Sequence, residues 1–216
     1  YSVVPNGTVV LPYVPVFQFY GDKMIGQVLE TFVTNIYNGR TAHTTLKSIN
    51  TDKDQMDFLN GIMANDPIAI GQYTRILEAK AKEFRASTDR VLLEAGFRRA
   101  PSFETSRLAA RIALDAGWQG TSHVDMLMDG SADTPQVGGT MAHSWIMCFE
   151  DEAEAYRAWD RIFPGTTMLI DTYDVINAAN MIKGMMDRGE ITPPNEVRID
   201  SDPLEEYTVK VAKIFE

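Results

Sequence analysis

A histidine beside small residues is the first feature of this sequence that suggests chemistry. His143 follows the stretch Gly138-Gly139-Thr140-Met141-Ala142 and precedes a segment with amphipathic spacing, 149–162. Glycines let a backbone come close to a bulky anionic ligand, and the amides at a helix start attract negative charge. The residue types therefore fit an anion site next to an imidazole, although a lone histidine at such a junction can equally be structural.

Four other predicted strand ends carry polar groups of similar kinds. They are Gly96-Phe97-Arg98-Arg99, Thr121-Ser122-His123, Asp171-Thr172-Tyr173-Asp174 and Arg198-Ile199-Asp200-Ser201-Asp202. In a barrel, all such ends face one mouth, so these groups would share a single site. Guanidinium groups bind phosphate or carboxylate bidentately, and aspartates suit ribose hydroxyls or Mg²⁺. A purely structural role explains any one of these residues more easily than it explains polar groups in all five loops together.

Several of these residues also have a purely structural interpretation. Asp174 or Ser201 would serve as a helix N-cap. Arg98 and Arg99 would form a surface pair, and His123 would be a core imidazole with a hydrogen-bond partner.

The elements that position these residues alternate between strand and helix from residue 91 onward. The sequence predicts strands at 91–93, 120–126, 136–141, 167–170 and 196–199, with a turn-rich insertion at 129–135. Helices are expected at 102–115, 149–162, 174–187 and from Pro203 onward. Alternation of this kind predicts βαβ units around a parallel sheet. Five units are too few to close a usual barrel, so we expect the opened half of one.

Residues 1–90 have a different pattern. The β-rich segment 8–20 is broken by two prolines, which predicts edge strands. Helices are expected at 23–48, 50–66 and 72–90, the first with a buried stripe of Met24, Val28, Phe32 and Ile36. The predicted fold class is therefore α/β, with a partial α+β outer domain over 1–90 and a partial, irregular (β/α) barrel over 91–216.

The composition excludes several classes of protein. Of the 216 residues, 44% are hydrophobic and 23% charged, and Cys148 is the only cysteine. No disulfide framework or cysteine-based zinc site can form, which favours a cytoplasmic setting. A net charge of −10 argues against a nucleic-acid partner. No apolar run approaches about 18 residues, so no membrane span is expected. Because the chain begins at Tyr1 within strand-like sequence, we expect it to be part of something longer.

In order and spacing, motifs along almost the whole chain resemble those of the nicotinate phosphoribosyltransferase family, which is related to nicotinamide phosphoribosyltransferase. Residues 5–12 resemble its amino-terminal strand motif, and Leu29-Glu30-Thr31 with Asn35 resembles its "LLET…N" helix. Further matches are Glu94 to Ala100 with "EFGxRRA", Gly120-Thr121-Ser122 with "GTSN", Gly139 to Trp145 with "GTxAHSW", Asp171 to Asp174 with "DTYD", and Val197 to Ser201 with "xRxDSGD".

The resemblance implies a barrel of the type II phosphoribosyltransferase kind. It also implies formation of nicotinate mononucleotide and pyrophosphate from nicotinate and phosphoribosyl pyrophosphate, in NAD biosynthesis. ATP as co-substrate and Mg²⁺ would assist, and His143 would be the histidine that ATP phosphorylates. Asp171 and Asp200 match acidic residues near ribose and metal, although no residue is assigned as a direct metal ligand. The implied substrate-binding positions are Phe97, Arg98, Arg99, Ser122, Gly139, Thr140, Arg198 and Ser201. A homodimer with shared active sites is implied as well.

Elementary chemistry agrees with these assignments. The transition state at C1 of the ribose resembles an oxocarbenium ion and needs nearby carboxylates, while the departing pyrophosphate needs arginine and Mg²⁺. A histidine must be neutral to attack ATP, so we expect activity to fall below about pH 6.5.

Three departures from the family pattern leave alternatives open. Ala95 replaces the phenylalanine before the glycine, His123 replaces the asparagine after "GTS", and Ser201-Asp202 lacks the intervening glycine of "DSGD". A transferase for nicotinamide or another base, or a catalytically silent paralogue that binds nucleotide, would also fit. Because family members are much longer, we expect a partial chain that exposes apolar edges and neither folds nor catalyses alone.

Overall fold

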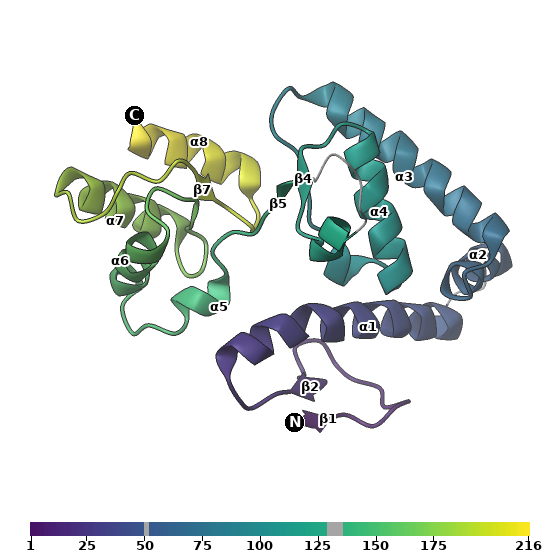
Figure 1. The fold of residues 1–216 in the computed structure, drawn as a ribbon. Coiled ribbons are helices and arrows are strands. Elements are labelled where there is room, and N and C mark those ends of the chain that lie inside the picture. Colours follow the sequence, from purple (N-terminus) through teal and green to yellow (C-terminus); the bar gives the residue numbers. More distant parts are fainter. Residues whose placement is uncertain (50–51, 129–135) are drawn as a thin grey trace. The chain divides into compact units, whose positions relative to one another are not determined.

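The computed structural model describes residues 1–49, 52–128 and 136–216, and the insertion predicted at 129–135 lies outside them. The chain forms two compact units, a first unit of residues 1–138 and a second unit of residues 139–216 (Figure 1). Helices predominate in both, and short strands pair in each, so the fold is mixed α and β. A barrel and an outer domain remain predictions.

The amino-terminal segment forms less strand than the sequence predicts. Only β1 (Ser2–Val3) and β2 (Phe17–Gln18) form there, as an antiparallel pair that aligns Ser2 with Gln18. Prolines at 12 and 15 cannot donate to a ladder, and Tyr13 between them has a φ of 66°, which an extended strand does not tolerate. The predicted edge strand over 8–20 is therefore wrong except at β2.

Three helices follow. They are α1 (Lys23–Ile49), α2 (Lys53–Met63) and α3 (Pro67–Ser87). The Asp66 carboxylate accepts hydrogen bonds from the amides of Ile68 and Ala69, and proline suits the first helical turn. Helix α3 therefore begins at Pro67, five residues before the predicted start.

The apolar stripe predicted to be buried on α1 is exposed. The side chains of Met24, Val28, Phe32 and Ile36 are between 46% and 79% exposed. The buried residues of α1 are instead Asn35 and Gly39, one helical turn apart. Helix α1 contacts the following part of the first unit through this polar and small face, and the partly exposed ring of Phe32 beside it lies against Phe97 and Phe103.

Helix α1 buries this face because its backbone comes close to the backbone of residues 97–101. The Asn35 amide donates to the carbonyl oxygens of Phe97, at 2.8 Å, and Ala100, at 3.1 Å. A Cβ added at Gly39 would lie 2.1 Å from the carbonyl oxygen of Pro101. Only a residue without a side chain fits there, so α1 is anchored to residues 97–101 by hydrogen bonds and close contact.

The first unit also contains a parallel three-stranded sheet. Its strands are β3 (Leu93–Glu94), β4 (Gly120–Thr121) and β5 (Gln136–Val137), in that order. The 3₁₀ helix η1 (Phe97–Arg99) and α4 (Phe103–Asp115) connect β3 to β4, as a βαβ unit requires. After β4 the chain turns into the 3₁₀ helix η2 (Val124–Met128), so the strand predicted to reach residue 126 is wrong beyond residue 121. The amide of His123 donates to the Thr121 hydroxyl and starts this turn.

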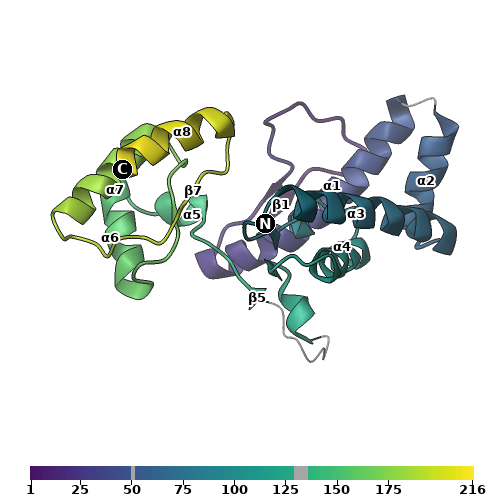
Figure 2. The ribbon, with the colours of Figure 1, turned by 90° about the horizontal axis from the view of Figure 1, so that it is seen from above.

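The second unit contains four helices and a two-stranded parallel sheet. The elements are α5 (His143–Ile146), α6 (Glu152–Ile162), β6 (Met168–Leu169), α7 (Val175–Asp187), β7 (Val197–Arg198) and α8 (Leu204–Phe215). Helix α7 packs against α6 and α8 (Figures 1 and 2). The core is built from side chains of every helix together with β6, among them Ile146, Tyr156, Leu169, Ile182 and Val211.

The parallel pairing expected for the βα region is confirmed, but not within one sheet. Strands β3, β4 and β5 pair in the first unit, and β6 pairs with β7 in the second. Each strand has two residues, because the chain leaves the ladder at the polar loops that follow. The predicted domains, 1–90 and 91–216, stay a prediction, although α3 and α4 pack together across that position.

Candidate active site in the second unit

The ends of β6 and β7 bring two aspartates together. Leu169 aligns with Arg198 in the parallel register, so Asp171 and Asp200 both follow the paired residues by two positions. The amide of Asp200 donates to Oδ2 of Asp171 at 2.8 Å, and the hydroxyl of Ser201 donates to the same oxygen at 2.7 Å. The loop after β7 is therefore fixed onto the Asp171 carboxylate.

The Asp171 side chain is fully buried. Its Oδ1 has no hydrogen-bond partner within the part of the chain that the structure describes. Burying an uncompensated carboxylate oxygen is costly, and such oxygens are normally satisfied. The basic group that faces Oδ1 is the His143 imidazole, whose Nε2 lies 3.9 Å away.

His143 is the first residue of α5, and its side chain is 38% exposed. Its Nδ1 lies 3.2 Å from Oγ1 of Thr172. On the opposite side of the ring, Nε2 lies 3.7 Å from Oδ2 of Asp200, in addition to its contact with Asp171. The imidazole thus has a hydroxyl at one nitrogen and two carboxylates at the other.

Arg198 extends this cluster toward the chain segment before His143. Its Nη2 lies 2.8 Å from Oδ2 of Asp200, and its Nη1 donates to the Thr140 hydroxyl at 2.5 Å. The side chains of Arg198 and Asp200 are about one-third exposed. A guanidinium, three hydroxyls, an imidazole and two carboxylates therefore form one cluster, in which the Asp171 side chain is covered and the side chains of Arg198, His143 and Asp200 are partly exposed. Such an arrangement is able to bind an anion and move a proton.

A buried tyrosine holds the end of the strand that precedes Asp171. Tyr156 in α6 is fully buried, and its hydroxyl contacts the Leu169 carbonyl oxygen and Oε1 of Glu152, each at 3.0 Å. Burial raises the pKa of Tyr156 and the pKa of Glu152. The phenol is therefore neutral at physiological pH and holds the end of β6 by a hydrogen bond.

Six predicted site residues come together in this unit, and a seventh residue, Asp174, has the helix-capping role predicted as its structural alternative. The six are Thr140, His143, Asp171, Arg198, Asp200 and Ser201. Asp174 is the N-cap of α7 and accepts from the amide of Asn177. Gly139 is exposed, and a Cβ there would have no atom within 4 Å, so packing does not require glycine at this position.

Sequence reasoning gave no role to Thr172. It lies within the "DTYD" match, but nothing in the sequence shows that its hydroxyl reaches His143. One signal was available in the sequence. Thr172 directly follows Asp171 at the end of a strand, where successive side chains point to opposite sides, so the two side chains can contact different atoms of one group.

The remaining predicted residues belong to the first unit. Arg98 pairs with Glu30 of α1 at 3.0 Å, and Asn38 donates to the Arg98 carbonyl oxygen. Arg99 and Ser122 are exposed. A common mouth that joins these residues to His143 stays a prediction.

Phe97 is buried in an aromatic cluster of the first unit. Its ring stacks on His123 with centroids 4.4 Å apart and meets Phe32 and Phe103 edge-on, at 5.4 Å each. Nε2 of His123 lies 3.0 Å from the Ser106 hydroxyl, whereas Nδ1 has no partner among the described residues. The interpretation of His123 as a core imidazole fits this environment, with one ring nitrogen unsatisfied.

The buried His123 predicts a pH-dependent stability of the first unit. Burial lowers the pKa of His123 below its usual value, against the opposing charges of Asp125 and Glu94. The unfolded chain therefore binds more protons than the folded one below about pH 6.5. We expect the free energy of unfolding to fall with decreasing pH in that range, by no more than about 1.4 kcal/mol per pH unit.

Amide hydrogen exchange in α4, followed between pH 5 and 7.5, would measure this effect. His123→Asn should flatten the dependence, whereas His43→Asn, which removes an imidazole bound to Asn60 rather than stacked in the core, should not. Equal slopes in the protein and in His123→Asn would refute the assignment.

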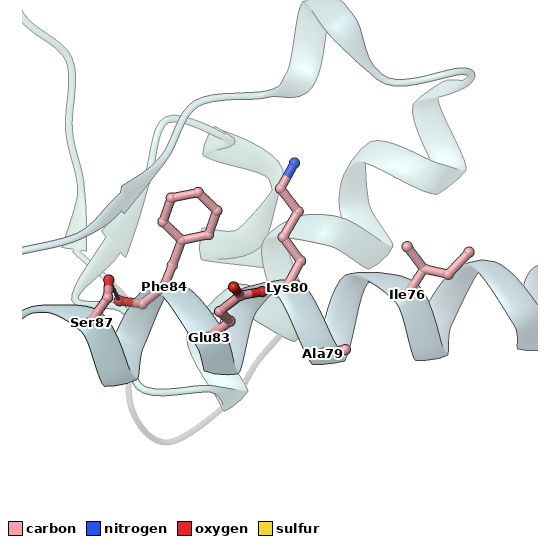
Figure 3. Close-up of a pocket in the computed structure, with 6 residues that line it drawn as sticks. All are labelled: Ile76, Ala79, Lys80, Glu83, Phe84 and Ser87. Carbon is pink, nitrogen blue, oxygen red and sulfur yellow. Dashed lines mark hydrogen bonds between the residues drawn. The ribbon is translucent and has the colours of Figure 1, made fainter.

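No second cluster of metal-ligating side chains is found among the described residues, and two hollows lie in the first unit. The described residues contain no group of three or more His, Cys, Asp or Glu side chains arranged to hold a metal ion. A hollow of about 570 Å³ runs along α3, lined by Ile76, Ala79, Lys80, Glu83, Phe84 and Ser87 (Figure 3). None of these is a predicted site residue. A cavity of about 290 Å³ between α3 and α4 includes Arg99, a predicted substrate-binding residue, and the half-buried Tyr73, whose pKa is raised by its partial burial.

The curated proteins that this chain resembles share one class. Polar groups at the carboxyl ends of parallel strands are typical of α/β proteins that bind small ligands, and the curated proteins similar to this chain are phosphoribosyltransferases. More particularly, each is named a nicotinate phosphoribosyltransferase.

The chain is 29% identical over 205 residues to nicotinate phosphoribosyltransferase pncB2 of Mycobacterium tuberculosis, a match that covers 94% of the chain and 36% of the relative. It is 29% identical over 150 residues to the Bacillus subtilis (strain 168) nicotinate phosphoribosyltransferase, covering 68% of the chain and 30% of the relative. No model of a known protein family matches. The resemblance predicted from the motifs is confirmed, and the chain spans about a third of the length of these relatives.

Among the described residues, no helix combines the length and apolar character needed to cross a membrane.

Proposed function

We propose that the protein containing this chain is a nicotinate phosphoribosyltransferase of NAD salvage. It would form nicotinate mononucleotide and pyrophosphate from nicotinate and phosphoribosyl pyrophosphate. The observation that carries the proposal is the clustering of His143, Asp171, Arg198 and Asp200 in one site. These residues come from three separate motifs that match the family, and the similar curated proteins bear this enzyme's name.

The residues of the second unit suit the charges that develop in this reaction. As the bond from C1 to pyrophosphate lengthens, positive charge grows on the ribose, and the Asp171 and Asp200 carboxylates would stabilise it. Arg198 would bind departing phosphate oxygens with its fork of N–H groups. It already spans from Asp200 to Thr140, so its guanidinium is held in place.

Mg²⁺ fits this site as an ion held jointly by protein and substrate. Mg²⁺ commonly binds through one or two carboxylates together with substrate phosphates. The side chains that would hold it are Asp200 and Asp171, whose Oδ1 has no hydrogen-bond partner among the described residues. When bound, the ion would neutralise charge on the pyrophosphate.

ATP hydrolysis through His143 is the finer part of the proposal. A ring nitrogen would attack the γ-phosphorus, the bond from phosphorus to the β-phosphate oxygen would break, and ADP would leave. The family resemblance supports this step, and the carboxylates at Nε2 would stabilise the cationic ring that results. A homodimer with shared active sites is proposed on the same resemblance.

The test is formation of nicotinate mononucleotide by the purified protein, with and without ATP. We expect product to rise with ATP, because phosphorylation of His143 couples hydrolysis to transfer. The ATP effect should vanish in His143→Ala and persist in His43→Ala, which removes a histidine of α1 that contacts Asn60. An ATP effect that survives in His143→Ala would refute the phosphohistidine, and absence of product would refute the choice of substrate.

A transferase for another base is the second candidate, and one observation favours it. Ala95 supplies no ring for stacking on a pyridine, and His123 covers one face of Phe97. Competition between nicotinate, nicotinamide and other nitrogen bases for phosphoribosyl pyrophosphate would identify the substrate. Binding of phosphoribosyl pyrophosphate without turnover of any base would indicate a silent paralogue.

A further inference from the structure

We propose that the cavity between α3 and α4 is a binding site for a small aromatic carboxylate, with the Arg99 guanidinium as the group that binds its charge. The cavity measures about 290 Å³ and is lined only by residues of the first unit. The inference goes beyond the proposed function, which is carried by contacts within the second unit. The ligand class is a single aromatic ring that bears one carboxylate.

Apolar and aromatic side chains form most of the wall of the cavity. Helix α3 contributes Leu77 and Phe84, and Trp118 follows α4. The rings of Phe84 and Trp118 meet edge to face with their centroids 6.1 Å apart, and the indole N–H donates to the Ala81 carbonyl oxygen at 3.1 Å. The indole is therefore held in place with its polar group satisfied. Such rings bind a further ring by offset stacking or edge contact.

The charged groups of the wall favour an anion. Arg99 and Lys80 both line the cavity, and neither side chain has an ion-pair or hydrogen-bond partner within the described part of the chain. Figure 3 shows Lys80 on the same side of α3 as Phe84. The carboxylate in the wall, Glu94, already accepts from the Gly96 amide and the Thr121 hydroxyl. Two cations and one carboxylate leave a net positive charge, which attracts an anionic ligand.

The remaining features of the cavity restrict the kind of anion. The Tyr73 hydroxyl has no hydrogen-bond partner among the described residues, and partial burial raises the pKa of Tyr73, so the phenol remains a donor. A guanidinium binds a carboxylate bidentately. Pockets for drug-sized ligands measure about 300 to 1,000 Å³, so this cavity suits a single ring. A phosphate would leave the aromatic wall uncovered, and an uncharged ring would leave Arg99 without a partner.

The experiment is ¹⁹F NMR of the complete protein labelled with 5-fluorotryptophan and titrated with benzoate to about 10 mM, a range suited to so small a ligand. The signal of Trp118 is identified by its loss in Trp118→Phe. We expect benzoate to shift this signal and to leave those of Trp145 and Trp159, in the second unit, unchanged. Benzamide keeps the ring without the charge, so it should bind at least about 10-fold more weakly.

Two variants test the cavity itself. Arg99→Gln should weaken benzoate binding about 10-fold, because the charged partner of the carboxylate is lost. Ala109→Leu should remove binding, because the larger side chain fills the cavity that Ala109 lines. Arg99 is exposed and Ala109 is half-buried, so neither change disturbs a fully buried position. Arg75→Gln is the matched control, since Arg75 also belongs to α3 but does not line this cavity. It should bind benzoate like the unmodified protein.

Nicotinate has the same chemistry and is titrated in parallel. Comparable shifts of the Trp118 signal with benzoate and nicotinate would support a site for ring acids in general. A shift with nicotinate alone would overturn the inference, because recognition would then depend on the ring nitrogen. No shift with benzoate, as would occur if another part of the protein fills the cavity, would overturn it too, as would equal binding by Arg99→Gln. None of these outcomes requires turnover, so the proposed function is tested separately.

Discussion

Asp171→Asn should lower the rate constant of nicotinate mononucleotide formation by a factor on the order of 10² to 10³, with a much smaller loss of stability. The amide oxygen can still accept from the Asp200 amide and the Ser201 hydroxyl, so the loop after β7 stays in place. The amide nitrogen then occupies the position of Oδ1 and presents hydrogens to Nε2 of His143. The negative charge that would stabilise the cationic ribose and the cationic phosphorylated imidazole is lost.

Asp174→Asn is the matched control. It makes the same chemical change three residues later, at the N-cap of α7, where asparagine caps as well as aspartate. Initial rates at saturating substrate and thermal unfolding should be measured for both variants. A small rate effect in Asp171→Asn, or an equally large one in Asp174→Asn, would show that the buried carboxylate is structural only.

Gly39→Ala should destabilise the first unit by about 3 kcal/mol, although alanine is the better helix former. The added methyl group would lie 2.1 Å from the Pro101 carbonyl oxygen and 3.1 Å from its carbonyl carbon. Both are backbone atoms, so no side-chain rotation relieves the clash, and α1 must move away from residues 97–101. The hydrogen bonds from Asn35 to Phe97 and Ala100 would then lengthen.

Gly71→Ala tests the same substitution where nothing opposes it. Gly71 lies inside α3, and a Cβ there meets no atom within 4 Å. Helix propensity predicts a gain of about 0.5 to 1 kcal/mol for this variant. Denaturant unfolding of both variants should give opposite signs, and two stabilised variants would mean that α1 does not approach Pro101 as closely as described.

The local elements were largely predictable from sequence because their signals are short-range. Helix α1 was expected at 23–48 and occupies 23–49, and α7 was expected at 174–187 and occupies 175–187. Apolar periodicity, N-caps and terminal glycines act over a few residues, so they can be seen in the sequence. The sequence predicts too late a start for α3, because a proline inside a helical pattern commonly breaks the helix, whereas the ring of Pro67 suits a first helical turn.

The face that α1 buries was not predictable from sequence. Periodicity favours the apolar stripe, and the structure instead buries Asn35 and Gly39. The preference depends on backbone carbonyl groups more than sixty residues away, at Phe97 and Ala100, which need a donor and space. No local pattern carries that information.

In the candidate site, the sequence by itself determined which residue types follow each strand and, through its motifs, the family they resemble. It also predicted that Asp171 and Asp200 follow strands whose ends face one mouth, and the parallel register of β6 and β7 then aligns the two residues. Only the tertiary structure decided that the Asp171 side chain is buried, with one oxygen that has no hydrogen-bond partner among the described residues, and that Thr172 reaches Nδ1 of His143. Burial and side-chain contacts depend on how α5, β6 and β7 pack in three dimensions, which spacing along the chain does not specify.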